Sequence, residues 1–351
     1  MNLAQLLTNP LFSVFSLTAA INKLPYMPGL IGGLNLFTPN PLATTVVLIE
    51  ANDNTLALIP AQPRGAPADI NVEGGRELVP FIVPHFPLRD TVMADSILGV
   101  RAFGTDNQLE AINQVIGARV ASMGRKEDVT QEWLRLGAIK GTIITAVDRE
   151  TGAPKSSIDL FSAFGVSAQP VQNWPIILTP PITEADAWGG PIRALCLSVQ
   201  RAIATELGGQ GFSGVVGICG ATFFDAVATS PETRQTFLNT PQAASLRDST
   251  YGSAFVYGGI RFLEYMGGVG NLAFVADDEA HFFPIGVPDL FVEAYAPADY
   301  IETVNTLALP RYAKQEIMDF DKGVMIETQM NVLPLCTRPR TLITAKAVAG
   351  T

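Results

Sequence analysis

The sequence predicts an α+β fold, and three observations along its 351 residues lead to this prediction. Residues 105–137 carry apolar side chains at the spacing of one long helix. Strand-like segments lie on both sides of that helix, at 44–59 and 77–83 before it and at 325–335 after it. Residues 183–305 combine short helices and strands in a compact unit of their own, so the elements are segregated along the chain.

The first 41 residues are apolar but are repeatedly interrupted by proline and glycine. Because proline fixes φ and removes a hydrogen-bond donor, we expect an extended arm with one short helix near its start. Such an arm cannot form a core of its own. We therefore expect a neighbouring molecule to cover it.

Residues 42–95 are expected to form a long two-stranded excursion with an irregular tip. Strand-like residues 44–50 and 55–59 are joined by a polar turn, residues 60–67 are rich in proline and glycine, and a third strand covers 77–83. A lone hairpin is marginally stable in water, so this segment must lie on something, for which another subunit is the natural candidate.

Charged residues near the tip of this excursion are candidates for contacts between subunits. They are Arg64 at the tip and Glu73, Arg76 and Glu77 behind it. Ion pairs across an interface are one interpretation. The alternative is that these charges are merely solvated, since exposed pairs contribute little to stability.

The long helix has a buried stripe and a plausible start. Thr105 or Asp106 would be its N-cap. The stripe consists of Leu109, Ile112, Ile116, Val120 and Met123. We expect an interruption near Gly124, after which the helix resumes through Val129, Trp133 and Leu136.

The rest of the chain alternates between strands and helices. A hairpin is expected from 142–147 and 156–160, and a proline-rich loop from 165–182. Within 183–305 we predict helices at 192–207, 222–228 and 232–238 and strands at 215–219, 255–257, 260–265, 272–276 and 281–284. Residues 325–335 are predicted to form one long strand, followed by another at 341–345.

Composition limits the possible classes of function. The chain is 48% hydrophobic and only 16% charged, which favours extensive contacts between subunits. Its net charge is −10 and it has no basic cluster, so specific nucleic-acid binding is not expected. The apolar residues 11–21 are too few to span a bilayer, and the three cysteines are expected to be reduced and buried.

Motifs that carry chemistry are not convincing in this sequence. His85 lies in a turn, and His281 follows the acidic residues 277–279, whose side chains would diverge in a tight turn. The G-x-G-x-x-A match at 268–273 continues as a strand instead of opening a helix, and Gly211-Phe212-Ser213-Gly214 lacks the spacing of a nucleophile elbow. We predict no catalytic, cofactor-binding or metal-binding residue.

The order of parts resembles that of lambda-type major capsid proteins, the capsid protein E family. The order is apolar arm, long hairpin, long helix, hairpin, α/β unit and final strand, and the stretch MDFDKGVMIETQMNVLP at 318–334 supports the resemblance. The resemblance implies the Hong Kong 97-type fold. It places the N-terminal arm at 1–41, the E-loop at 42–95, the peripheral domain at 96–182 and 306–351 with spine helix 105–137, and the axial domain at 183–305.

The resemblance also implies a function. The chain is expected to assemble into hexamers and pentamers of the icosahedral head of a tailed bacteriophage, in the host cytoplasm, and to enclose double-stranded DNA without sequence-specific binding. Scaffolding, portal and decoration proteins are the expected further partners, and no cofactor or membrane is expected. Two alternatives are a soluble α/β enzyme with an unrecognised site, and a shell-forming compartment that holds an enzyme cargo.

Overall fold

A computed structural model of the chain describes residues 18, 21–22, 29–52, 76–93, 108–148, 153–177, 191–238, 254–269 and 272–349. The chain divides into two compact units. The first unit contains Met1–Val47, Pro80–Leu134 and Val292–Pro334, and the second contains Leu48–Val79, Arg135–Phe291 and Leu335–Thr351. Both units contain helices and strands, which confirms the predicted α+β class.

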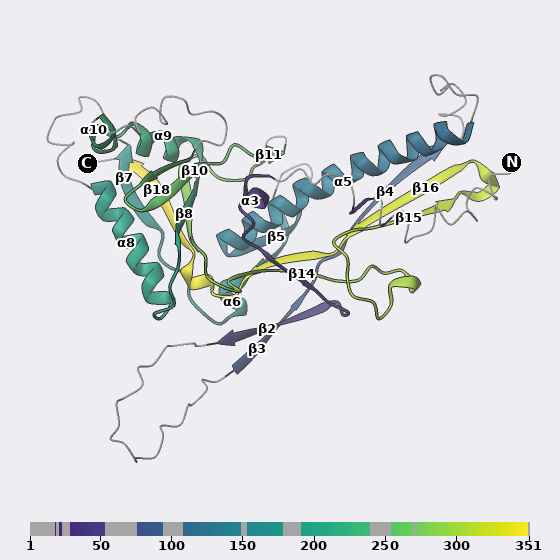
Figure 1. The fold of residues 1–351 in the computed structure, drawn as a ribbon, viewed down its shortest axis with the longest axis horizontal. Helices are drawn as coiled ribbons and strands as arrows, with labels where there is room; N and C mark the ends of the chain where they lie inside the picture. Colours follow the sequence, from purple (N-terminus) through teal and green to yellow (C-terminus); the bar gives the residue numbers. More distant parts are fainter. Residues whose placement is uncertain are drawn as a thin grey trace, which may run out of the picture. The chain divides into compact units, whose positions relative to one another are not determined.

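The long helix α5 spans Gln108–Lys140 and confirms the predicted helix (Figure 1). Ile116, Val120 and Met123 of the expected stripe are buried. The predicted interruption at Gly124 is wrong, because the helix continues through this buried residue. A single glycine costs a helix only about 1 kcal/mol relative to alanine, and the packing of a long helix readily offsets that cost.

In the first unit, α5 packs on an antiparallel three-stranded sheet. The sheet order is β15 (Tyr312–Ile317), β16 (Gly323–Met330) and β4 (Phe86–Met93). Figure 1 shows these strands running alongside α5. The shared core consists of Ile21, Val92, Ile116, Val120, Met123, Ala313, Val324 and Ile326.

The described part of the N-terminal arm is anchored within the first unit. It contains α3 (Leu30–Gly33) and β1 (Thr38–Pro41), and β1 pairs in parallel with β14 (Phe291–Tyr295). Ile31 is fully buried. Thr38, Pro39 and Pro41 of β1 are nevertheless exposed, so cover of the arm by a neighbour stays a prediction. The prolines of β1 do not prevent pairing, because β1 is an edge strand, where a missing donor is tolerated.

The C-terminal stretch predicted as one long strand is two strands in two sheets. After β16 the chain turns at Asn331, and β17 (Val332–Cys336) pairs with β14. The Asn331 amide donates to the Pro297 carbonyl at 2.9 Å and lies 2.8 Å from Nδ1 of His85. The buried Asn331 amide has these partners at the residue where the strand breaks. The pattern of apolar residues in the sequence does not reveal this local effect.

The second unit is built on a six-stranded sheet with the order β7-β18-β13-β8-β10-β9. The strands are β7 (Gln172–Ile177), β8 (Gly214–Cys219), β9 (Ala254–Tyr257), β10 (Ile260–Glu264), β13 (Glu279–Ile285) and β18 (Ile343–Ala349). The helices α8 (Pro191–Glu206), α9 (Ala221–Thr229) and α10 (Pro231–Leu238) confirm three predictions. Gly208 and Gly209 end α8 with φ of +60° and +90°, as expected.

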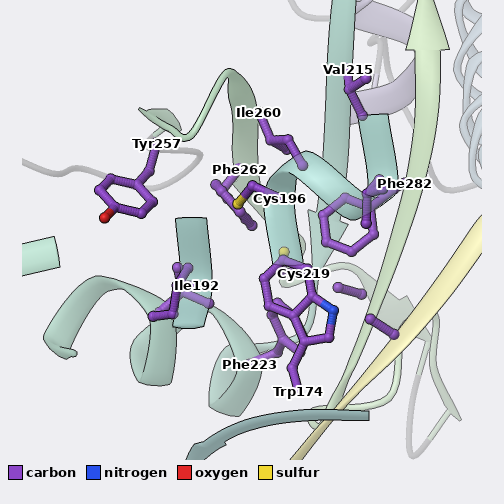
Figure 2. Close-up of a cluster of buried hydrophobic side chains, with 14 of the residues drawn as sticks. Trp174, Ile192, Cys196, Val215, Cys219, Phe223, Tyr257, Ile260, Phe262 and Phe282 are labelled. Atoms are coloured by element: carbon purple, nitrogen blue, oxygen red, sulfur yellow. The ribbon is translucent and has the colours of Figure 1, made fainter. Parts of the chain in front are cut away.

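The loop predicted at 165–182 is wrong for β7, which is an edge strand of this sheet. Trp174 is fully buried, whereas Pro175 is exposed at the edge, where it displaces no sheet hydrogen bond. Figure 2 shows Trp174 in the core with Phe223 and Phe282, whose ring centroids both lie 5.3 Å away. The strands β7 and β18 therefore share a sheet with β8, β9, β10 and β13.

A buried carboxylate joins three elements of the second unit. Glu232 of α10 accepts the backbone N–H groups of Ile192 and Arg193, at 3.0 and 3.1 Å, in the first turn of α8. It also accepts the hydroxyl of Tyr257 in β9 at 2.6 Å. The negative charge faces the positive end of the α8 dipole, which stabilises the packing of this helix.

The smaller elements complete the fold. The predicted hairpin is confirmed as β5 (Thr142–Val147) and β6 (Pro154–Asp159), followed by α6 (Leu160–Ala163). The strand predicted at 272–276 is shorter, because β12 covers Leu272–Ala273 and pairs with β11 (Gly268–Val269). The three cysteines are free and buried, as predicted.

Candidate assembly surfaces

The strands β2 (Val46–Asn52) and β3 (Arg76–Ile82) form a two-stranded ribbon, called the ribbon below. Its side chains alternate between two faces. Val47, Ile49, Val79 and Phe81 are buried, whereas Val46, Leu48, Leu78 and Ile82 are between 37% and 73% exposed. Both faces of the ribbon are therefore apolar.

The face that carries Val46, Leu48, Leu78 and Ile82 is called the outer face of the ribbon. An apolar outer face is unusual for a sheet that is exposed to water. Antiparallel sheets with one solvated face normally alternate apolar and polar side chains. Adjacent exposed aliphatic side chains are typical of a surface that a partner covers. The outer face of the ribbon is therefore the first candidate assembly surface.

The sequence contained a signal for this face that the search for charged contacts missed. The runs Val46-Val47-Leu48-Ile49 and Leu78-Val79-Pro80-Phe81-Ile82 have no polar residue in alternate positions. Such continuous runs are typical of strands buried on both faces. The predicted contacts Arg64 and Glu73 lie outside the described residues; Arg76 and Glu77 lie in β3, and their side chains also lie outside the described part.

A second exposed apolar surface lies in the first unit, on residues 299–310 between β14 and β15. This aliphatic loop exposes Ile301, Val304, Leu307 and Leu309, with exposed fractions from 44% to 91%. Hydrogen bonds hold its shape. The Thr303 hydroxyl donates to the Ala298 carbonyl at 2.7 Å, and the Leu309 N–H donates to the Tyr312 hydroxyl oxygen at 2.8 Å.

The charged groups of α5 are used inside the first unit. The Arg311 guanidinium donates to the Asp128 carboxylate and lies 3.5 Å from that of Glu127, and all three residues are buried. Burial raises the pKa of Glu127, although the Thr328 hydroxyl and Arg311 act in the opposite direction. These charges join α5 to the start of β15.

A further carboxylate of α5 holds the arm. Glu132 is buried and accepts the N–H groups of Ile31 at 2.7 Å and Gly32 at 3.1 Å. A side chain at Gly29 would collide with the end of the Glu132 side chain, so a larger residue there would force this carboxylate to shift. Glu127, Asp128 and Glu132 of α5 therefore all interact with groups inside the subunit.

His281 is a structural residue of the second unit. Its Nδ1 lies 3.2 Å from the Thr344 hydroxyl and its Nε2 lies 3.6 Å from the Glu279 carboxylate. Burial, with Lys140 and Lys346 nearby, lowers the pKa of His281 to about 3, so the imidazole is neutral at pH 7. In the parts of the chain that the structure describes, no group of three or more His, Cys, Asp or Glu residues could hold a metal ion.

An open polar pocket in the first unit has charged groups that are already paired. Arg89 donates to Glu327 at 2.9 Å, Lys314 donates to Glu302 at 2.9 Å, and Tyr300 donates to Glu327 at 3.3 Å. Burial and the neighbouring Glu327 raise the pKa of the Tyr300 hydroxyl. This raises the free energy of forming the phenolate, so the hydroxyl is held as a hydrogen-bond donor.

The fold and its exposed aliphatic surfaces define a structural protein whose subunits cover one another in an assembly. Residues 13–347 match the phage major capsid protein E family, and the chain belongs to this family. This family is structural and non-enzymatic. The chain is therefore a major capsid protein of a phage head, located in the virion, and it assembles into a multimeric shell.

Relatives and solved structures agree with this assignment. The chain is 27% identical to the major capsid protein of Salmonella phage Felix O1 and 24% identical to that of Pseudomonas phage KPP10, in each case over 96% of this chain and 97% of the relative. A crystal structure of an Escherichia coli CFT073 prophage protein assigned as a capsid protein has a TM-score of 0.53 at 16% identity, covering 94% of this chain and 97% of that one. A satellite phage P4 procapsid structure has a TM-score of 0.50 at 10% identity, covering 100% and 93%.

These likenesses confirm the predicted Hong Kong 97-type phage capsid fold. None of the described helices is long and apolar enough to cross a membrane.

Proposed function

We propose that this chain forms hexamers and pentamers, and that these close into the icosahedral head of a tailed phage around double-stranded DNA. Assembly takes place in the host cytoplasm, with scaffolding, portal and decoration proteins as further partners. The six-stranded sheet of the second unit forms the axial domain, and α5 with the sheet β15-β16-β4 forms the peripheral domain. The ribbon is the base of the E-loop, whose Arg64, Glu73, Arg76 and Glu77 make ion pairs with a neighbouring copy.

The observation that carries this proposal is the apolar outer face of the ribbon. Burying an aliphatic side chain contributes roughly 1.5–3 kcal/mol, and each copy in a shell repeats the same contact. The Leu48 and Ile82 side chains, 58% and 73% exposed in the subunit, can gain this contribution only from another molecule. The occupant of the ribbon face is a second copy of the chain.

The charge of the chain supports an enclosing role toward DNA. With 33 acidic and 23 basic residues, the subunit has a net charge of −10. Affinity for nucleic acid depends chiefly on cations that neutralise phosphates, so a shell of this composition surrounds packed DNA without holding it tightly.

The test replaces two apolar side chains of the outer face with polar ones and keeps residues that favour strands. The double variant Leu48→Thr with Ile82→Thr has β-branched residues, which favour strands, at both positions. We expect it to fold with an unchanged melting temperature but to form few or no closed particles in negative-stain microscopy. The control Leu48→Ile with Ile82→Val keeps the face apolar and should assemble normally.

Two results would oppose the proposal. Closed particles of normal size and yield from the Thr variant would show that the outer face is not a contact surface. Particles that contain protein cargo and no DNA, when made with the complete packaging machinery, would favour the compartment alternative.

A further inference from the structure

The turn between β15 and β16 holds a phenylalanine in an unusual conformation. Phe320 lies in the 3-10 turn Asp319–Asp321 with φ of +63° and ψ of +23°. The turn is closed by the Met318 N–H, which donates to the Gly323 carbonyl at 3.0 Å. A bulky residue rarely adopts this left-handed conformation, which glycine and asparagine adopt far more readily.

The ring gains little from this position within the subunit. Phe320 is 90% exposed, and the Lys322 ammonium lies 5.5 Å from the ring centroid. Across the sheet, Met93 faces Gly323 in the register of β4 with β16, and it is also exposed. This end of the sheet therefore presents two large apolar side chains to solvent.

An exposed aromatic residue with a strained backbone contributes little to the stability of the subunit. Strained backbone positions are typically found where they serve a function. Aromatic side chains dominate the binding energy of protein interfaces when a partner buries them, and polar residues commonly surround them. Phe320 lies between the exposed Asp319 and Lys322, which together have this arrangement.

We propose that the β15–β16 turns of neighbouring copies meet one another in the assembled shell, with Phe320 at the centre of the contact. The proposal rests on the proposed function, because it requires a shell of repeated copies. The occupant is a second copy because the turn is complementary to itself. The turn carries the acidic Asp319 and Asp321 and the basic Lys322 around Phe320 in sequence, so rotation about an axis can place the lysine of one copy beside an aspartate of the next.

The first test separates a contact role from a structural role. Phe320→Gly and Phe320→Asn both remove the ring and suit the left-handed backbone. We expect the melting temperature of the unassembled subunit to stay the same or rise. The assembled fraction, measured by sedimentation velocity, should fall roughly tenfold or more, as for the loss of an interface hot spot.

A matched control introduces glycine at another residue that has a positive φ. Asp289 is an exposed turn residue of the second unit with φ of +53°. Asp289→Gly should leave assembly unchanged. A lower melting temperature of both Phe320 variants, with normal assembly by the molecules that fold, would overturn the proposal and assign Phe320 to subunit stability.

The second test uses the charges to identify the occupant. Lys322→Glu leaves only acidic charges in the turn, and Asp319→Lys leaves Asp321 as its one acidic residue, so each should reduce assembly. The double variant inverts both charges and restores complementarity between identical turns, so it should recover assembly. If the double variant assembles no better than the poorer single variant, the turns do not meet.

The outcomes also separate this inference from the proposed function. Normal assembly of Phe320→Gly, together with failure of the ribbon variant, would refute the role of Phe320 and leave the ribbon contact intact. A wild-type chain that never assembles with its packaging machinery would refute both proposals.

Discussion

Acidification from pH 7 to pH 5 should destabilise the second unit through His281. The imidazole is buried on β13, between β8 and β18, and faces Glu279, Lys140, Lys346 and the Thr344 hydroxyl. Burial is the main cause that lowers its pKa to about 3, and the two lysines add to the effect. Protonation therefore has to overcome desolvation and the repulsion of two cations.

The direction of this pH effect follows from the difference in the pKa of His281 between the folded and the unfolded chain. The unfolded chain binds a proton on His281 as the pH falls below about 6.5, and the folded chain does not until about pH 3. The contribution to stability is complete above pH 6.5 and is lost progressively below it. Between pH 6.5 and pH 5 the loss is about 2 kcal/mol, at about 1.4 kcal/mol for each pH unit.

The assay is urea unfolding of the unassembled chain at pH 7 and pH 5, for the wild type and His281→Gln. Carboxylates titrate in both proteins, so the measured quantity is the difference between their pH dependences. We expect the wild type to lose about 2 kcal/mol more than the variant over this interval. His85→Gln, at the other histidine of the chain, is the control. Identical pH dependence in the wild type and His281→Gln would refute the reasoning.

Two further predictions concern buried charges. Arg311→Met leaves two buried carboxylates of α5 without their cation, so we expect the free energy of unfolding at pH 7 to fall by about 3–5 kcal/mol. The control Arg89→Met removes an exposed ion pair and should change this free energy far less. Equal losses in the two variants would contradict this. Glu232→Gln weakens charge-assisted bonds at the start of α8 and should cost about 1–3 kcal/mol by urea unfolding. The comparison is Glu206→Gln at the other end of α8, whose carboxylate pairs with the exposed Arg340 side chain instead of with backbone N–H groups. An unchanged stability of Glu232→Gln would show that these bonds do not hold the helix.

The sequence predicted the elements whose apolar pattern is regular. The helix α5 and its buried residues Ile116, Val120 and Met123 follow directly from helical spacing. The pattern failed where a tertiary contact decides the local structure. β7 forms despite its proline because it lies at a sheet edge. The strand breaks between β16 and β17 because Asn331 has a hydrogen-bond partner far away in sequence.

The candidate surfaces were predicted only in part. A contact role was predicted for charged residues within 42–95, but this interpretation overlooked the aliphatic runs beside Arg76 and Glu77. The exposure of Phe320 could not be predicted, because a sequence does not show that a turn places a phenylalanine at positive φ. Such a conformation becomes visible only when the flanking strands are in register.

The low charge content and the assembly of this protein have one physical explanation. Only 16% of its residues are charged, and several of them are used inside the subunit, where Arg311 joins α5 to β15 and Glu232 joins α8, α10 and β9. This leaves fewer charges to cover the surface. The ribbon and the aliphatic loop are the result, since both leave large apolar side chains exposed. Charges that fix the shape of one copy therefore leave apolar surfaces available for contacts in the multimeric shell, so subunit folding and shell assembly depend on the same distribution of residues.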